Sequence, residues 1–261
     1  MKWGSLDSFL VQDKFWQDKM GKPIANRDFM LALLTYGTLD SYRFYYLDEE
    51  DMAFGRAGLE DNLPIENLAR VALATQSELA ADAEAGDIDI LHQGDFTFHA
   101  PYLMEYRAGA GLARPFGISG ITHSLDGVKI QSRLIDMLLA GPRPYDNIVC
   151  TSACARQMLT AAFAAIAENF KERFAAALPE PPELVHIPLA ISDAFAEMPE
   201  RGQCRAALGL GEAEFVLLCL GRFSARRKMD LAPMLECLQY LKARGDLQPF
   251  TLILAGGGSE S

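Results

Sequence analysis

Residues 117–152 read GISGITHSLDGVKIQSRLIDMLLAGPRPYDNIVCTS and give the clearest indication of the fold. A short run rich in glycine and isoleucine, Gly117–Thr122, predicts a strand. Apolar residues then recur at helical spacing over Val128–Leu139, and a second short apolar run follows at Asn147–Thr151. A strand, a helix and a strand in this order are typical of a parallel sheet with helices on both faces.

The same alternation continues on both sides of this stretch. On the N-terminal side, the pattern predicts strands at Arg43–Leu47 and Ile88–Leu91, helices over Pro64–Ala85 and around Ala100–Arg107, and a first helix opened by Pro23–Arg27 with Asn26 as N-cap. On the C-terminal side, it predicts a long helix from the cap Ser152 to about Ala177 and a strand at Leu184–Ile187. We therefore expect residues 1–195 to form one doubly wound, Rossmann-like α/β domain.

A second α/β region begins after Met198–Gly202, which we interpret as a hinge. The elements expected there are a buried strand at Glu214–Leu220, a helix over Leu231–Ala243 and a strand at Phe250–Ala255. Residues 196–261 fall short of the ~100 residues typical of a complete domain of this kind. We expect them to be the first part of a second Rossmann-like domain that is truncated at its C-terminal side.

Composition narrows the class of protein. The net charge of −11 argues against nucleic acid as a partner, and a hydrophobic content of 50% excludes a disordered chain. The most apolar helical stretch, Met158–Ala167, is bounded by Arg156 and Glu168 and is too short to cross a bilayer. Asp7 and Asp13 interrupt the first apolar stretch, so it does not resemble a signal peptide.

The cysteines point to a reducing compartment. The cysteines are odd in number, and most of them lie in apolar runs. They are Cys150, Cys154, Cys204, Cys219 and Cys237. No second Cys/His pair stands at metal-binding distance from the first two in the sequence, so we expect buried free thiols, no metal and a cytoplasmic protein.

The strongest chemical signal is the loop Gly221–Lys228, which follows the strand predicted at Glu214–Leu220. It holds three arginines and one lysine in an otherwise acidic chain. Guanidinium and ammonium groups together suit a diphosphate, and Gly221 allows close approach of the backbone. The alternative is a solvated basic loop without a ligand.

Further candidates follow other predicted strands. His123 comes after the strand at Gly117–Thr122, and the alternative for it is a structural histidine. The run His92–Asp95 offers Gln93, Gly94 and Asp95 to a hydroxyl-rich ligand, or forms an ordinary turn. Asn26 either caps its helix or receives a ligand group there.

Several common nucleotide and hydrolase motifs are absent from the sequence. Gly109-Ala-Gly111 lacks the third glycine of a dinucleotide fingerprint and follows a predicted helix rather than a strand. The sequence also has no P-loop, no G-x-S-x-G and no H-E-x-x-H. These absences weigh against nicotinamide-dependent oxidoreduction, P-loop ATP hydrolysis and α/β-hydrolase chemistry.

Taken together, the motifs resemble the family-4-type retaining glycosyltransferases of the GT-B fold. The segments that carry the resemblance are Gly221-Arg222 with Lys228-Met-Asp-Leu, Tyr145–Ser152, Val185–Pro188, Thr251–Gly256 and His123. The chain departs from the family at Pro188–Ser192, where a loop glycine and an acid are lost, and at Gly21–Asn26, which stands in place of a glycine-rich first loop. The pair of glutamates that contacts the donor in that family would lie beyond Ser261.

The resemblance implies transfer of a sugar from a nucleoside-diphosphate-sugar to an acceptor, with retention of configuration and without metal or other cofactor. The roles that it implies are catalysis by His123, Arg222 and Lys228, donor binding by Gly221, Arg222, Lys228, Gly256 and Gly257, and acceptor binding by Asn26, Gln93, Gly94 and Asp95. A carbohydrate or lipid-linked acceptor and peripheral membrane contact fit this scheme, while the oligomeric state is left open. The alternatives are a sugar-nucleotide epimerase or phosphorylase of the same fold, and a non-catalytic module that binds a carbohydrate or a partner.

Overall fold

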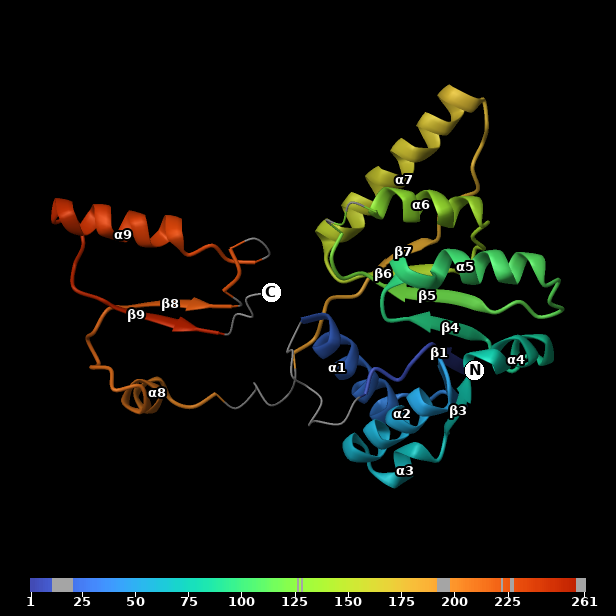
Figure 1. The fold of residues 1–261 in the computed structure, drawn as a ribbon, viewed down its shortest axis with the longest axis horizontal. Coiled ribbons are helices and arrows are strands. Elements are labelled where there is room, and N and C mark those ends of the chain that lie inside the picture. The colour runs from blue at the N-terminus through green and yellow to red at the C-terminus, as the bar shows by residue number, and fades with distance from the viewer. Residues whose placement is uncertain are drawn as a thin grey trace. The chain divides into compact units, whose positions relative to one another are not determined.

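The computed structural model describes residues 1–10, 21–125, 127, 129–191, 198–221, 223–225 and 228–256. The chain divides into two compact α/β units, residues 1–192 (unit 1) and 193–261 (unit 2) (Figure 1). The sequence pattern had suggested a boundary between residues 195 and 196.

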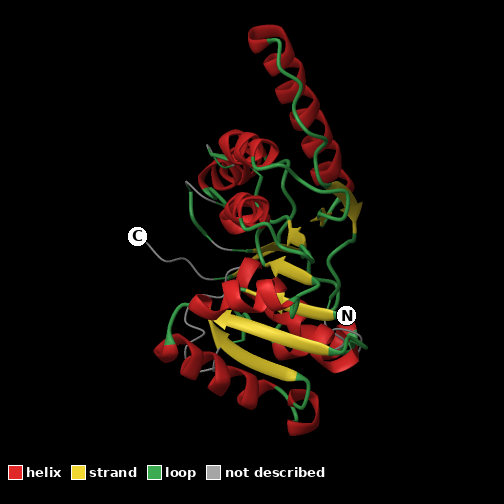
Figure 2. Ribbon diagram, turned by 90° about the vertical axis from the view of Figure 1, so that its right-hand side faces the viewer, coloured by secondary structure: helices red, strands yellow, loops and turns green. Residues whose placement is uncertain are grey.

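Unit 1 is built on a parallel sheet whose strands, within the described residues, run in the order β3-β2-β1-β4-β5-β6-β7. The strands are β1 Lys2–Ser5, β2 Ser41–Tyr46, β3 Val71–Thr75, β4 Ile90–Gln93, β5 Gly117–Ile121, β6 Asn147–Cys150 and β7 Glu183–His186. Every neighbouring pair is parallel. The larger arrows in Figure 2 accordingly point the same way. The strand order reverses direction between β1 and β4, which confirms a Rossmann-like arrangement.

Helices flank this sheet and bury two hydrophobic clusters. The helical elements are α1 Gly21–Tyr36, α2 Glu49–Asn62, α3 Ile65–Leu68, the 3₁₀ turn Gln76–Glu78, α4 Leu79–Ala85, α5 Phe96–Gly109, α6 Ile130–Leu139 and α7 Ala153–Phe174. One cluster packs Met30 and Leu34 of α1 and Leu59 of α2 against β1 and β2. The other packs α5, α6 and α7 against β4, β5 and β6. In Figure 1, α1–α3 accordingly lie with the β1–β3 end of the sheet.

Several element predictions are confirmed with small shifts in their bounds. Ser152 caps α7 as expected, because its side chain accepts the backbone N–H of Ala155 at 3.0 Å. Tyr42 and Phe44 of β2 are fully buried, as a core strand requires. The strand at Gly117–Ile121 and the helix that follows it reproduce the alternation from which the fold was predicted.

One helix prediction is wrong, and the strands β1 and β3, the helix α2 and, in unit 2, the helix α8 (Arg201–Ala207) went unpredicted. The segment Pro64–Ala85 is not a single helix, since it contains α3, the strand β3 and then α4. Its alanines and leucines match helical spacing, but Val71–Thr75 finds full backbone pairing beside β2, which overrides local preference. The strand β1, Lys2–Ser5, was missed because Trp3 is its one large apolar residue, so no apolar run marks it in the sequence.

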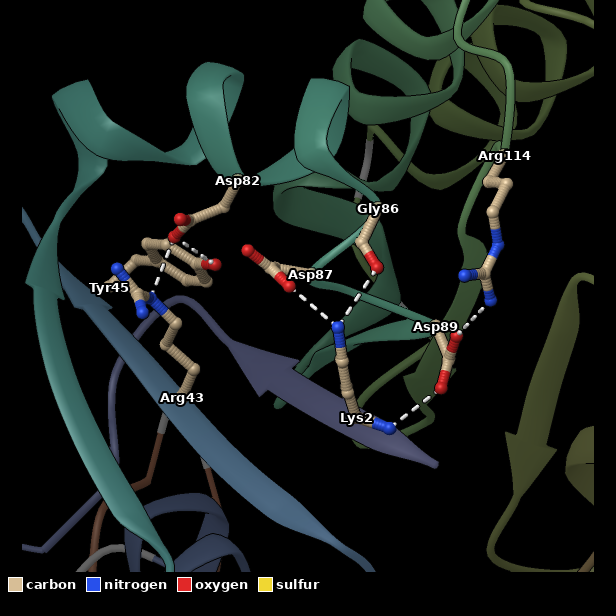
Figure 3. A network of polar contacts seen from close by, with 8 residues as sticks. All are labelled: Lys2, Arg43, Tyr45, Asp82, Gly86, Asp87, Asp89 and Arg114. Carbon is tan, nitrogen blue, oxygen red and sulfur yellow. Dashed lines mark hydrogen bonds and ion pairs between the residues drawn. The ribbon is translucent and has the colours of Figure 1, made fainter.

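The amino ends of the strands are joined by charged side chains (Figure 3). Lys2 on β1 places its Nζ 2.6 Å from Asp87, and its backbone N–H donates to Asp89 at 2.7 Å. Arg114 pairs with Asp89 from the other side at 3.3 Å. These contacts fix the start of β1 against the segment that leads into β4.

A buried ion pair closes the same end of the sheet between β5 and β6. Nη1 and Nη2 of Arg107 each lie 2.6 Å from one carboxylate oxygen of Asp146. That carboxylate also accepts the backbone N–H groups of Ile118 and Arg143, each at 2.8 Å. Arg107 donates in addition to the carbonyl of Phe116 at 2.8 Å, so the pair is fully bonded although it is excluded from water.

Unit 2 contains the helices α8 Arg201–Ala207 and α9 Ala232–Arg244 and the strands β8 Val216–Leu220 and β9 Thr251–Ala255. Its described strands form a two-stranded parallel sheet, with Cys219 opposite Leu254. The strand predicted to be buried is partly exposed, with Leu218 and Leu220 at 60% and 71% exposure. This prediction is wrong because a pair of strands cannot cover both faces in the way a wide parallel sheet does.

The cysteine prediction is partly wrong. All five cysteines lie in the described part of the chain and are free thiols. Cys150 is buried, but Cys154, Cys204 and Cys237 are exposed, since their helices turn these positions outward. Across the described ranges, no helix is both long and apolar enough to span a bilayer.

Candidate functional site

The carboxyl ends of β1, β4 and β5 meet where the strand order of unit 1 reverses. In open parallel sheets of this kind, ligands bind in the crevice beyond those ends. Ser5 ends β1, His92 and Gln93 end β4, and Thr122 and His123 directly follow β5. The polar groups that the sequence offered for unit 1 are therefore carried to one edge of the sheet.

Three of the predicted residues form a hydrogen-bonded cluster at this edge. The Nε2 atom of His123 lies 2.9 Å from Oδ1 of Asn26 and 2.8 Å from the carbonyl oxygen of Gly94. Asn26 in turn donates from Nδ2 to the same carbonyl at 3.0 Å. We call Asn26, Gly94 and His123 the His123 cluster. It ties α1 to the loops after β4 and β5.

Gly94 is required by the packing of this cluster. A Cβ atom at position 94 would lie 2.5 Å from the ring of Phe9 and 2.6 Å from Nδ2 of Asn26. Asn26 has little room to withdraw, because it is buried in α1. The close approach of α1 to the backbone after β4 therefore depends on a residue without a side chain.

Asn26 does not cap a helix. The prediction is wrong because α1 already begins at Gly21, so that Asn26 lies inside the helix and faces the sheet. Its carboxamide satisfies groups from two distant loops rather than the N–H groups of its own first turn. The sequence signal of a cap and the actual role share one cause, which is the short amide side chain.

Asp95 and Lys22 lie beside the cluster and neutralise one another. One oxygen of Asp95 caps α5 by accepting the backbone N–H of Thr97 at 3.0 Å, and the other lies 2.7 Å from Nζ of Lys22. Lys22 also lies over the ring of Phe98, 4.3 Å from its centroid. Asp95 thus has a local structural task, and its negative charge is matched by a cation.

The His123 ring carries no charge at neutral pH. Burial lowers its pKa below the ordinary histidine value, and the nearby ammonium of Lys22 acts in the same direction. The carbonyl of Gly94 and the carboxylate of Asp95 oppose this effect without overcoming it. The edge of the sheet therefore presents an uncharged, hydrogen-bonding surface, which suits a ligand with hydroxyl groups.

His92 and Gln93 are drawn into the interior. His92 stacks on Trp3 with ring centroids 5.4 Å apart, its Nδ1 lies 3.3 Å from the hydroxyl of Ser119, and burial lowers its pKa to about 4. Gln93 is buried and donates from Nε2 to the carbonyl of His92 at 2.9 Å. Neither residue contacts the His123 cluster through a hydrogen bond within the described ranges.

The loop after β1 contributes features that sequence reasoning missed. Asp7 and Phe9 adopt φ values of 120° and 58°, which are strained for residues with a side chain. The hydroxyl of Tyr46 donates to Ser8 at 2.8 Å, and the carboxylate of Asp7 accepts the N–H of Phe9 at 3.0 Å. Burial raises the pKa of the Asp7 carboxyl.

The first loop of the fold, which follows β1, was assigned to the wrong residues. Because β1 was not recognised, the first loop was matched to Gly21–Asn26, whereas that segment belongs to α1. The residues that follow β1 are Leu6–Leu10. An Asp-Ser pair directly after a strand was the available signal.

In unit 2, the basic loop follows β8 as predicted, and part of it is described. Gly221 and Gly256, which follow β8 and β9, are in close contact, since a Cβ at position 256 would lie 1.7 Å from the Gly221 carbonyl oxygen. The N–H of Lys228 donates to the carbonyl of Ser224 at 2.9 Å, and the Lys228 side chain is exposed. Arg222 and Gly257, which were predicted to bind the donor, lie outside the described residues.

In the part of the chain that the structure describes, neither a metal centre nor the apolar groove of unit 1 coincides with the predicted site. Throughout the described residues, no group of three or more His, Cys, Asp or Glu side chains could hold a metal ion. An apolar groove of unit 1 lies between α7 and Pro179–Pro182, and it is lined by none of the predicted site residues. Comparisons with models of known protein families and with curated protein sequences gave no match to this chain.

Proposed function

We propose that the protein is a retaining glycosyltransferase, which moves a sugar from a nucleoside-diphosphate-sugar to a hydroxyl group of an acceptor. The observation that carries the proposal is the loop after β8. It concentrates three arginines and one lysine in a chain of net charge −11, beside two glycines that leave the strand ends without side chains. Such a loop suits a diphosphate, because cations and bare backbone can both approach its oxygens.

The polar groups of unit 1 also support the proposal, because they match the hydroxyl groups of a sugar. The His123 cluster offers neutral donors and acceptors at the switch point of a Rossmann-like sheet. Sugar hydroxyls are matched by such groups, whereas a phosphate would require cations. An anion-binding loop in one unit and an uncharged polar edge in the other are the two surfaces that a transfer from a nucleotide-sugar needs.

In the proposed reaction, Arg222 and Lys228 hold the diphosphate and stabilise the charge that develops as it leaves. The bond between the sugar C1 and the diphosphate oxygen breaks, and the acceptor oxygen bonds to C1 on the same face. The acceptor proton passes to the departing diphosphate. His123 orients the sugar, Gly221, Gly256 and Gly257 admit the donor, and Asn26, Gly94 and Asp95 form the acceptor side. Gln93, which the resemblance assigned to the acceptor, is buried and bonded to the His92 carbonyl, so it is left out of this proposal. The cations supply the charge, so the proposal includes no metal, and it places the protein in the cytoplasm.

The proposal is tested by calorimetric titration of the full chain with a panel of nucleoside diphosphates. We expect one member to bind, and the Arg222→Ala and Lys228→Ala variants to bind it about 10- to 100-fold more weakly, the loss of one charge-assisted contact. Lys242→Ala, which removes an exposed cation from α9, is the matched control and should change the Kd by less than about twofold. If no diphosphate binds, or if both loop variants bind as the wild type does, the proposal fails.

A second experiment separates transfer from the related activities. The matching nucleotide-sugar is incubated with and without a panel of saccharide acceptors, and the products are followed by proton NMR. We expect a new glycosidic bond of the donor's configuration that requires an acceptor. Conversion of the donor without any acceptor would instead identify an epimerase, and binding without turnover would identify a non-catalytic module.

A further inference from the structure

The bonding of Asn26 and His123 fixes the position of one proton. Nε2 of His123 lies within hydrogen-bond distance of the Gly94 carbonyl oxygen, which can only accept. Nε2 must therefore carry a proton and donate. Asn26 also presents an oxygen to Nε2, because its amide nitrogen is engaged with the same Gly94 carbonyl at 3.0 Å. Turning the Asn26 amide over would set two oxygens against each other.

We infer that Asn26 is a positioning residue that holds His123 in the Nε2–H form, so that Nδ1 faces the ligand side as a hydrogen-bond acceptor. A neutral imidazole protonated on Nε2 has its lone pair on Nδ1. Nδ1 has no hydrogen-bond partner within the described ranges of the chain. The matching ligand group is a donor such as a sugar hydroxyl, whereas a phosphate oxygen would meet a lone pair. This last step rests on the proposed function; the proton position does not.

The charges around the ring are consistent with a neutral acceptor. Lys22 of α1 and Asp95, which precedes α5, are the charged groups that act on His123, and they pair with each other at 2.7 Å. Neither charge is left unmatched to draw a second proton onto the ring. Asn26 itself is uncharged and buried, so it directs the proton without favouring the imidazolium form.

The arrangement depends on Asn26 in a way that capping or simple packing would not. Its two amide atoms serve opposite purposes, with the oxygen accepting from His123 and the nitrogen donating to Gly94. An aspartate in its place would keep the acceptor but add a negative charge beside Nε2. That charge would stabilise the imidazolium ring and remove the lone pair from Nδ1.

The inference is tested by nitrogen-15 NMR of the full chain with labelled histidine, with His123 assigned from the missing signal of a His123→Gln variant. We expect His123 of the wild type to be neutral at pH 7 with its proton on Nε2. We expect Asn26→Asp to raise the pKa of His123 by about one pH unit or more, and Asn26→Leu to weaken the preference for Nε2, which then depends on the Gly94 carbonyl alone. Inorganic phosphate should leave the Nδ1 signal in place.

Either of two results would overturn the inference. The first is a wild-type ring protonated on Nδ1, or charged at pH 7, which needs no variant to fold. The second is an Asn26→Asp variant that folds and titrates as the wild type does. Failure of the proposed function is distinguishable, because nucleoside diphosphate binding and the proton position of His123 are read from separate experiments. If the protein binds no diphosphate but His123 is protonated on Nε2, the proposed function is refuted and the proton position stands.

Discussion

The two ends of the unit 1 sheet differ in how their polar groups are used. At the amino end, every charge that we describe meets an opposite charge, as in Arg107–Asp146 and Lys2–Asp87. At the carboxyl end, the His123 cluster is neutral beside the single ion pair Lys22–Asp95, the backbone is strained at Asp7 and Phe9, and Nδ1 of His123 has no partner within the described residues. Strain of this kind lowers the stability of the fold, and the unpaired acceptor is free to bind a group of a ligand. The amino end thus stabilises the fold, and the carboxyl end is where we propose that a ligand binds.

The largest effect is expected at the amino end, from Asp146→Ala. The substitution leaves Arg107 buried with its charge unmatched, and it strands the N–H groups of Ile118 and Arg143. We expect a loss of about 3–5 kcal/mol in the free energy of unfolding. The measurement is urea denaturation followed by tryptophan fluorescence, which reports on unit 1 because Trp3 and Trp16 both belong to it.

The control for this prediction is Asp136→Ala. Asp136 pairs with Arg133 at 3.6 Å on the surface, with half of its side chain exposed. We expect a change of less than about 1 kcal/mol. Equal effects of the two variants would show that the buried pair is not what holds the amino end.

At the carboxyl end, His92 makes the stability of unit 1 depend on pH. Its folded-state pKa of about 4 lies below the ordinary value of 6.5, so between these values the unfolded chain binds the additional proton. The stabilisation is complete above pH 6.5 and is lost as the pH falls toward 4, by about 3 kcal/mol in all. Urea denaturation at a series of pH values measures this loss.

His92→Leu should remove most of this pH dependence, because the variant lacks the buried imidazole; His99 and His123, whose pKa values burial also lowers, leave a smaller slope. His186→Gln is the matched control, since His186 is exposed, and it should leave the profile as it is in the wild type. A steep profile that survives in His92→Leu would assign the pH dependence to another residue.

Gly94→Ala tests the close packing of the His123 cluster. The added methyl group would press on Phe9 and Asn26 at less than 3 Å, so we expect a loss of about 1–3 kcal/mol in the free energy of unfolding. The His123 signal in nitrogen-15 NMR should also change. Gly109→Ala provides the control, since a Cβ there meets nothing within 4 Å, and it should not destabilise unit 1. Tolerance of alanine at position 94 would contradict the packing described here.

The smallest change is expected from Asp7→Gly, and it should be stabilising. Glycine relieves the φ of 120°, and the free energy of unfolding should rise by about 1 kcal/mol even though the bond to Phe9 is lost. Ala175→Gly, which relieves a φ of 51° at the end of α7, should stabilise to a similar degree. A drop in stability for Asp7→Gly would mean that the loop is not strained.

Much of unit 1 was predictable because strands of a parallel sheet and their helices differ in spacing. The run Asn147–Thr151 and the cap Ser152 show how short-range chemistry suffices there. Val71–Thr75 shows the limit, since its alternation of small and branched residues becomes a strand only through pairing with β2. Local preference cannot report a partner that lies about thirty residues away.

The candidate site was predictable in its residues but not in their roles. His123 and Gly94 were found because they follow strands, and parallel strands bring such residues to one edge. The role of Asn26 could not be found, since it depends on Gly94 and His123, which lie 68 and 97 positions away in the chain. Asp7 was missed because the strand before it, β1, was not recognised in the sequence.

The most direct test of the whole account is a map of amide chemical-shift changes in the full chain, recorded while the nucleotide-sugars of a donor panel are added one at a time. We predict that one donor shifts the signals of Gly94 and His123 in unit 1 and of Gly221 and Lys228 in unit 2. The signals of Lys2, Arg107 and Asp146 at the amino end should remain unchanged. Shifts confined to the amino end, or no shifts with any donor, would contradict it.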